Sequence, residues 1–319
     1  MTKIIGIGNA LVDVLVHLED ESLLRELRLP KGGMTLIDSE HLGAINAAIA
    51  PFHSVRATGG SASNTIHALA LLGNKVGFIG AIGNDEPGRF FRKQAELRGV
   101  DVHLSTVSGM ASGVATTFIT PDGERTFATH LGAATQIALE DQSLAAGGIL
   151  HVEGYLVQNH TFVEAAMRRA KEAGLLVSYD LASWNIVAAD RGFIHHLVAE
   201  YADIVFANQE EAATFCQQQE PEEALRQLAA LTQVAVVKVG KRGAFGCAKG
   251  EFAFAPGRPV KVTDTTAAGD FFAAGFLHGW VHGQPLEECL TAGNRIAGEV
   301  VQVMGTQVDA DRLRAAIAV

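Results

Sequence analysis

The segment Asp264–Asp270 combines the residue types that phosphoryl transfer requires. Its sequence, DTTAAGD, places a run of very small residues before a long apolar stretch that is typical of a buried helix. Ala267, Ala268 and Gly269 leave their backbone N–H groups accessible, and a helix's first turn presents such groups with the positive end of its dipole. The carboxylate of Asp270 could accept a proton from an attacking hydroxyl. The segment therefore predicts an anion hole with Asp270 as catalytic base, although an ordinary helix start with an acidic first turn fits the same residues.

Two glycine-bearing segments near the N-terminus could hold an acceptor that carries hydroxyl groups. GNALVD, at residues 8–13, follows an apolar run, and the carboxylate of Asp13 could accept two hydrogen bonds from a vicinal diol. GGSASN, at residues 59–64, opens a helical pattern, and its glycines allow a ligand to approach the backbone closely. Simpler interpretations are an outward-facing Asp13 on an alternating strand and a serine N-cap for the helix. The acceptor-binding residues that we predict are Asn9, Asp13, Gly59, Gly60, Ser61 and Asn64.

Residues for a nucleotide and its metal ion lie in the second half of the chain. In NQEE, Asn208 and Glu211 could together hold the water shell of Mg²⁺ beside phosphates, or Asn208 could simply cap a helix. The turn in VKVGKRGAFG could wrap a nucleotide's base or ribose. It is not a P-loop, because Arg242 follows Lys241 where Ser or Thr is required. GIGNAL, from residue 6, lacks the third glycine of a dinucleotide fingerprint.

Short apolar runs alternate with helical patterns, which predicts an α/β fold with a mostly parallel central sheet covered by helices on both faces. The predicted strands are 4–7, 76–79, 149–152, 175–179, 204–206 and 234–239. The predicted helices are 63–72, 86–98, 162–172, 221–231, 268–281 and 286–303. Ligands of such sheets bind beyond the carboxyl ends of the strands, although loops there are polar in any protein. The residues that follow these strands are all small or polar, namely Asn9, Glu153, Asp180, Asn208 and Gly240.

Two segments interrupt this alternation. Residues 11–38 contain the β-rich run LVDVLVHL but no long helix linked to a core strand. Residues 113–130 contain two β-rich runs around a Pro-Asp-Gly turn, which is a strong hairpin signal. We expect these inserted segments to form a small β-rich lid over the site, within a single α/β domain that spans residues 1–319.

The composition limits the classes of partner. A formal charge of −10 argues against nonspecific binding of nucleic acid and against an anionic membrane surface. No stretch is long and apolar enough to span a bilayer, and the first residues lack the pattern of a signal peptide. The three cysteines are far apart and have no metal-binding spacing, as in a reduced intracellular protein. We therefore expect a cytoplasmic protein with small-molecule partners.

The order of the motifs resembles that of the PfkB family of carbohydrate and nucleoside kinases, which have the ribokinase-like fold. GNxxxD, GGSxxN, a β-hairpin, NxxE and DTxxAGD follow one another between Ile4 and about Gly305, nearly the whole chain. Each motif is weak by itself, but five in this order are highly specific. The resemblance implies a phosphotransferase with Asp270 as the base, the amides of residues 267–269 as the anion hole, and Asn208 with Glu211 near Mg²⁺.

The resemblance also implies further ligands. The expected ATP-binding residues are Asn208, Lys238, Gly240, Gly243 and Asn294. Many relatives use K⁺ near the last motif, so Asp264 and Thr266 are candidate ligands of a K⁺ ion. Family members most often have glycine where this chain has Ala267, a change that is costly only if the position needs a positive φ.

The spacing of Asn9 and Asp13 looks most like the adenosine kinase branch, and Phe118, Phe127 and Trp184 are candidate walls for a purine. We therefore expect an ATP- and Mg²⁺-dependent kinase, monomeric or homodimeric, that phosphorylates a primary hydroxyl of an adenosine-like nucleoside or of a sugar. Ribose, fructose and 2-keto-3-deoxygluconate remain open as acceptors. A dinucleotide-binding oxidoreductase is disfavoured by the missing glycine, and a catalytically silent nucleotide-binding protein by the presence of the base and the Mg²⁺ residues.

Overall fold

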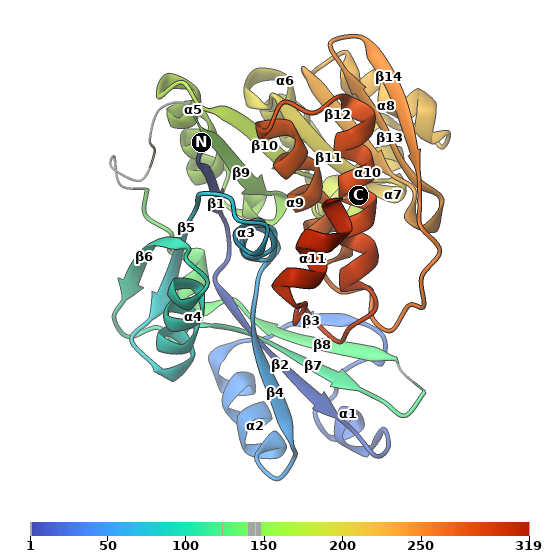
Figure 1. Ribbon diagram of the computed structural model, residues 1–319. Coiled ribbons are helices and arrows are strands. Elements are labelled where there is room, and N and C mark those ends of the chain that lie inside the picture. Colours follow the sequence, from blue (N-terminus) through green and yellow to red (C-terminus); the bar gives the residue numbers. More distant parts are fainter. Residues whose placement is uncertain (1, 123, 140–143, 145–147, 319) are drawn as a thin grey trace.

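The computed structural model describes residues 2–122, 124–139, 144 and 148–318. Within these ranges the strands form two sheets, a large one that makes the body of the molecule and a small one that projects from it (Figure 1). The helices are α1 (Ser22–Glu26), α2 (Ser39–Ile49), α3 (Ser61–Leu71), α4 (Glu86–Leu97), α5 (His160–Glu172), α6 (Trp184–Tyr201), α7 (Gln209–Cys216), α8 (Pro221–Ala229), α9 (Ala268–Val281), α10 (Leu286–Val300) and α11 (Ala310–Ile317).

The large sheet is mostly parallel. In the described part of the chain its order is β14-β13-β12-β11-β10-β9-β1-β5-β6, and only β13 and β14 run antiparallel to their neighbours. Its strands are β1 (Ile4–Ile7), β5 (Val76–Gly83), β6 (Asp101–Val107), β9 (Ile149–Glu153), β10 (Leu176–Asp180), β11 (Ile204–Asn208), β12 (Val234–Lys238), β13 (Gly243–Ala248) and β14 (Glu251–Pro256). The predicted α/β class and parallel sheet are confirmed.

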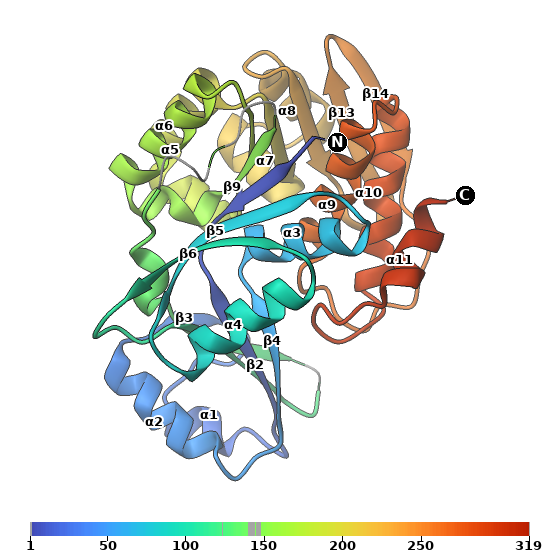
Figure 2. The same cartoon turned by 60° about the vertical axis from the view of Figure 1, so that its left-hand side comes forward.

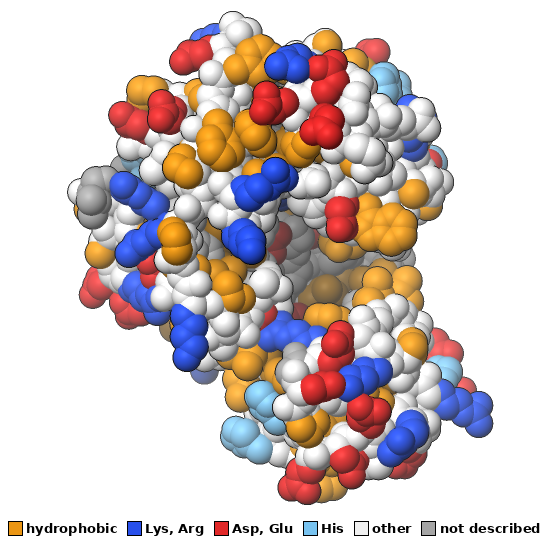
Figure 3. Space-filling view, turned by 90° about the vertical axis from the view of Figure 1, so that its right-hand side faces the viewer, with side chains coloured by type: hydrophobic (Ala, Val, Ile, Leu, Met, Phe, Trp, Pro, Cys, Tyr) orange, Lys and Arg blue, Asp and Glu red, His pale blue; other side chains and the backbone are white. Residues whose placement is uncertain are grey.

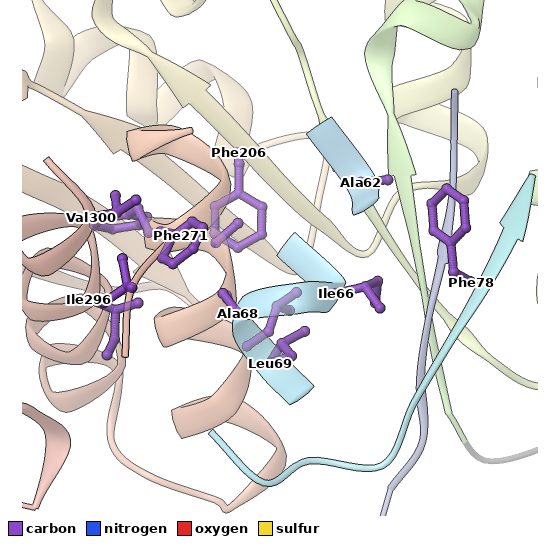
Figure 4. Close-up of a cluster of buried hydrophobic side chains, with 14 of the residues drawn as sticks. Ala62, Ile66, Ala68, Leu69, Phe78, Phe206, Phe271, Ile296 and Val300 are labelled. Carbon is purple, nitrogen blue, oxygen red and sulfur yellow. The ribbon is translucent and has the colours of Figure 1, made fainter. Parts of the chain in front are cut away.

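Helices cover both faces of this sheet, as predicted (Figure 2). Side chains alternate along each strand, so Phe206 of β11 packs with α3, α9 and α10, while its neighbour Val205 packs with α5 to α8. Figure 4 shows the first of these cores, where Ala68 and Leu69 of α3 lie on the side of Phe271 of α9, and Ile66 lies on the side of Phe78. Because α3 and α9 are fixed in this core, their N-terminal ends are held at the same edge of the sheet.

The small sheet is built mainly from the segments that the sequence marks as insertions. Its order in the described residues is β3-β8-β7-β2-β4, and β7 and β8 form the hairpin predicted at 113–130. Its strands are β2 (Leu11–His17), β3 (Met34–Leu36), β4 (Ser54–Gly59), β7 (Gly113–Ile119) and β8 (Arg125–His130). The strand β4 lies outside the segments expected to form the lid.

One face of the small sheet is packed and the other faces the large body. Val12 and Val14 belong to a core that includes Leu42 and Ile49 of α2. Asp13 lies between these valines in β2 and therefore points to the opposite face. Figure 3 shows a deep hollow between the small sheet and the large body. Among the described helices, none has both the length and the hydrophobicity that a membrane span requires.

Candidate active site

The loop before α9, where the sequence predicts an anion hole, makes a sharp turn at Ala267. Ala267 is the N-cap residue of α9, and its φ of 61° and ψ of 10° lie in the left-handed region. The first N–H groups of a helix have no intrahelical partners, but that of Ala268 donates to the carbonyl oxygen of Thr265 at 3.2 Å. The one departure from the family's motif thus falls at a position that favours glycine, and holding alanine there costs about 1–2 kcal/mol.

Asp270, in the first turn of α9, is held by α3. Ser61 Oγ donates to Asp270 Oδ1 at 2.7 Å, and Asn64 Nδ2 donates to Asp270 Oδ2 at 2.9 Å. Burial raises the pKa of Asp270 to about 6, although these two hydrogen bonds oppose the rise. A carboxylate with an elevated pKa and a fixed orientation is suited to accept a proton near neutral pH.

Glu153, at the end of β9, ties together the segments that carry the predicted acceptor residues. Its Oε1 accepts from the backbone N–H of Asn9 at 2.8 Å and from Asn9 Nδ2 at 2.6 Å, while its Oε2 accepts from the N–H of Ala62 at 3.0 Å. Burial raises the pKa of Glu153 to about 7 despite these bonds. The amide nitrogen of Asn9 is therefore engaged by Glu153, a residue that the sequence reasoning noted at a strand end but gave no role.

Two glycines allow the close packing of this corner. Gly60 has a φ of 93°, and a Cβ on it would lie 2.1 Å from the carbonyl oxygen of Asn9. A Cβ on Gly59 would lie 2.2 Å from Asp13 Oδ1, so the carboxylate of Asp13 rests directly on the backbone of β4. Only glycine fits at either position without displacing its neighbour.

Asp13 lies on the face of the small sheet opposite its valine-lined core. Burial raises the pKa of Asp13 to about 7, and the nearby carboxylates of Asp270 and Asp264 add to the rise. The carboxylates of Asp13, in β2, and of Asp270, in the first turn of α9, thus lie within electrostatic reach of each other.

The register of the small sheet shows which side chains share the face of Asp13. Asp13 pairs with Ala57 and Ala115, and Leu15 pairs with Val55 and Thr117. The same face continues with Phe127 and Thr129 of β8 and with Met34 and Leu36 of β3. The face is therefore largely apolar around one carboxylate.

This register corrects one prediction about a purine pocket. Phe118 pairs with Val16 and is fully buried with it on the far face of the small sheet, so it is not a wall of the site. A continuous apolar run does not reveal which of its residues faces a ligand. Phe127 lies on the face of Asp13, whereas Trp184 begins α6 and is 54% exposed.

A cavity of about 960 Å³ lies where the strands β10 to β12 end against the N-terminus of α9. Its lining includes the predicted residues Ser61, Asn64, Asn208, Glu211, Lys238, Gly240, Gly243, Thr266, Ala267, Ala268, Gly269, Asp270 and Asn294. Its apolar part is lined by Pro259, Val260, Val262, Phe272, Ala297 and Val301. A space of this size, with an apolar slot at one part and charged groups at another, suits a nucleotide. Asn9, Asp13, Gly59 and Gly60 lie outside this lining, and Asp264 lies beneath it.

Asn208 and Glu211 form a reciprocal cap at the start of α7. Glu211 Oε2 accepts from the N–H of Asn208 at 2.6 Å, Glu211 Oε1 accepts from Asn208 Nδ2 at 2.6 Å, and Asn208 Oδ1 accepts from the N–H of Glu211 at 2.8 Å. The simpler interpretation of this motif therefore holds, whatever else the pair does. Burial raises the pKa of Glu211 to about 7, although the charge of Lys238 opposes the rise.

These residues fit a metal ion that is held mainly by phosphate and water. Within the described residues no group of three or more histidine, cysteine or acidic side chains is arranged as a metal cage. Mg²⁺ commonly keeps several waters and binds substrate phosphates with only one or two carboxylates. A cation beside the buried Glu211 would also stabilise its charged form.

Lys238 brings a positive charge to the floor of the cavity. Its Nζ lies 3.0 Å from Asp180 Oδ2, and a Cβ on Gly269 would come within 3.2 Å of the same Nζ. Burial works to lower the pKa of Lys238, but the carboxylates of Asp180 and Glu211 raise it overall. Lys238 therefore carries its charge next to Gly269, at the N-terminus of α9. Asp180, another strand-end residue without a predicted role, holds it there.

Asn294 and Asp264 have mainly structural partners. Asn294 Nδ2 donates to the carbonyl oxygens of Ala255 and Pro256, at 2.9 and 3.3 Å, and so joins α10 to the end of β14. Asp264 accepts from the N–H of Thr266 at 2.7 Å and from that of Gly305 at 2.6 Å. Asp264 also pairs with Arg125, a residue that the sequence reasoning did not single out.

Comparison with known proteins defines the class. The model of the pfkB family carbohydrate kinases matches residues 31–312, and the chain belongs to this family. It is therefore a phosphotransferase that uses ATP and acts on a hydroxyl group of a small molecule. The fructokinase of Klebsiella pneumoniae is 32% identical over 242 residues, which cover 71% of this chain and 78% of the relative.

Two solved structures match over nearly the full length. The adenosine kinase from Sinorhizobium meliloti has a TM-score of 0.88 and 31% identity, with 99% of this chain and 98% of that chain covered. A probable sugar kinase from Rhizobium etli CFN 42 has a TM-score of 0.87 and 31% identity, with 100% and 98% covered. The family and the ribokinase-like fold predicted from the motifs are confirmed, whereas these relatives include both nucleoside and sugar kinases.

Proposed function

We propose that this protein is a Mg²⁺-dependent nucleoside kinase, which transfers the γ-phosphoryl group of ATP to a primary hydroxyl of an adenosine-like acceptor. The observation that carries the proposal is the position of Asp270, between the nucleotide-sized cavity and the face of the small sheet that carries Asp13. An acceptor bound there would have one end on the carboxylate of Asp13 and a hydroxyl at Asp270.

The chain's own groups account for the chemistry. Asp13 accepts hydrogen bonds from two vicinal ring hydroxyls, and Asp270 takes the proton of the attacking hydroxyl. The N–H groups of residues 267–269 and the Lys238 ammonium stabilise the negative charge of the transferred group. Mg²⁺, when bound near Asn208 and Glu211, neutralises the phosphate oxygens of ATP. A base with a moderate pKa is sufficient, since positioning and charge stabilisation dominate in a loose transition state.

The small sheet is proposed to act as a lid for this reaction. Its segments at 11–38 and 113–130 carry the face that looks into the hollow, and β4 completes that face. Closure of the lid would exclude water from the transferred phosphoryl group and so limit hydrolysis of ATP.

The apolar character of the lid face supports a nucleoside acceptor. Ala57 and Ala115 flank Asp13 on this face, Leu15 follows along β2, and Phe127 lies two strands away. Thr117 and Thr129 share the face, and Met34 and Leu36, 54% and 55% exposed, lie at its edge. An unsubstituted sugar would leave these side chains facing its hydroxyls, whereas a nucleobase would bury them and Phe127 could stack on it. A sugar acid would also require a cation on this face, where Arg125 is already paired with Asp264.

A sugar acceptor is the second candidate, because the fructokinase relative is 32% identical. A substrate panel separates the two. We would measure ADP release with Mg-ATP and adenosine, other nucleosides, ribose, fructose or 2-keto-3-deoxygluconate. Turnover with adenosine and not with the free sugars would support the nucleoside proposal. Turnover only with a sugar would keep the mechanism but refute the acceptor, and silence with all of them while ATP binds would refute both.

We also propose a cytoplasmic location for this protein. Its cysteines are free in the described part of the chain, which agrees with a reducing compartment.

A further inference from the structure

Arg125 crosses from the small sheet to the loop that precedes the anion hole. It begins β8, and its Nη1 contacts both Asp264 Oδ1 and Thr266 Oγ1. Its Nη2 lies 3.1 Å from the sulfur of Met304. The side chain of Asp264 is fully buried, and that of Arg125 is only 17% exposed. The guanidinium is therefore largely enclosed between the small sheet and the loop before α9.

This contact uses the oxygens that the sequence assigned to a K⁺ ion. Asp264 Oδ1 receives Arg125 and the N–H of Thr266, and Asp264 Oδ2 receives the N–H of Gly305. Thr266 Oγ1 receives Arg125 as well. Burial alone would raise the pKa of Asp264, yet it is lowered, because these donors favour the carboxylate. Residues arranged in this way do not fit a K⁺ ion, which would have to displace a buried guanidinium that carries the same charge.

We propose that the guanidinium of Arg125 replaces the monovalent cation that many relatives use, so that this enzyme works without K⁺. The cation and the guanidinium each bring one positive charge to Asp264, three residues before the anion hole begins. The two positive charges differ in their origin. A K⁺ ion would bind from solvent, whereas the guanidinium of Arg125 is covalently part of β8 in the small sheet. Arg125 thus adds to the stability of the loop before α9 when β8 lies against it.

This inference extends the proposed function but can be tested without it. We would replace K⁺ by tetramethylammonium at constant ionic strength and follow thermal unfolding of the full chain without substrates. The wild type should unfold at the same temperature in both salts. Arg125→Met keeps the length of the side chain but frees the oxygens of Asp264 and Thr266, so its unfolding temperature should rise by roughly 2 °C or more when 100 mM K⁺ is added.

Two further variants make the result specific. Arg226→Met removes a surface arginine that pairs with Glu222 and Glu223 on α8, and it should gain no response to K⁺. Arg125→Lys keeps a positive charge and should respond less to K⁺ than Arg125→Met. Stabilisation of the wild type by K⁺ would overturn the proposal even if Arg125→Met failed to fold, and so would a folded Arg125→Met protein that ignores K⁺. Because unfolding is measured without an acceptor, failure of the kinase assay would not alter either result.

Discussion

Replacing Gly59 with alanine should displace the carboxylate of Asp13 and weaken acceptor binding. A Cβ at residue 59 would lie 2.2 Å from Asp13 Oδ1, whereas ordinary van der Waals contact begins at 3.4 Å. The carboxylate would therefore have to move by about 1 Å, the difference between these distances. The backbone of Gly59 cannot easily retreat, because it is paired with Leu11 in the small sheet.

The expected loss follows from the hydrogen bonds that Asp13 would make. A hydrogen bond to a charged group contributes about 1.5–3 kcal/mol, so losing one of two bonds to a diol should lower kcat/KM for the acceptor by roughly 10- to 150-fold. The assay is steady-state ADP release with the acceptor varied at saturating ATP, and KM for ATP should stay unchanged.

Gly43→Ala is the matched control. Gly43 lies in α2, and a Cβ there would meet nothing within 4 Å. This variant should keep the kinetics of the wild type. A Gly59→Ala enzyme with unaltered kcat/KM for the acceptor, or with a defect confined to ATP, would refute the assignment of Asp13.

Three other predictions concern charge and backbone conformation. Because burial raises the pKa of Asp270 to about 6, kcat/KM should fall as the pH drops below about 6, and a pH–rate profile whose acid limb lies near 4 would argue against this base. The pKa of Asp13 is raised from 3.8 to about 7, so the folded ligand-free protein binds more protons than the unfolded chain between these values, and its stability should fall as the pH rises through this window. Urea unfolding at pH 5.5 and pH 8 tests this, and Asp13→Asn should flatten the difference. Ala267→Gly should raise the free energy of unfolding by up to about 1 kcal/mol. Glycine adopts the left-handed conformation without strain, but it also increases the conformational entropy of the unfolded chain, which offsets part of the gain. A loss of stability in urea would contradict the backbone geometry.

The central strands could be predicted because they are buried on both faces and therefore consist of continuous apolar runs, as in Val234–Lys238. The edge strand β6 (DVHLSTV) was missed, since a half-exposed strand carries polar residues. The glycine-rich start of β13 (GAFGCA) belongs to the segment for which the sequence predicts a ligand-binding turn. Its first residue does line the cavity, so the ligand-binding interpretation stays a prediction.

In the site, too, groups of residues that are adjacent in the sequence could be predicted, whereas residues that are far apart in the sequence could not. The loop at 264–270 could be recognised because small residues, a carboxylate and a helix start are adjacent in the chain. Arg125 could not, because its partner Thr266 is 141 positions away and nothing in the local sequence distinguishes this arginine from a solvated one. Glu153 is separated from Asn9 by 144 positions, and only its place at the end of a strand hinted at a role.

The most direct test of the central claim is the turnover of Asp270→Asn with the acceptor that the wild type phosphorylates. Asparagine keeps the size of the side chain but cannot take the proton. We predict that kcat falls by about 10²- to 10⁴-fold while the Kd for ATP, measured by calorimetry, stays within a few-fold of the wild type. Turnover close to that of the wild type would contradict the assignment of Asp270 as the base and with it the mechanism proposed for this site.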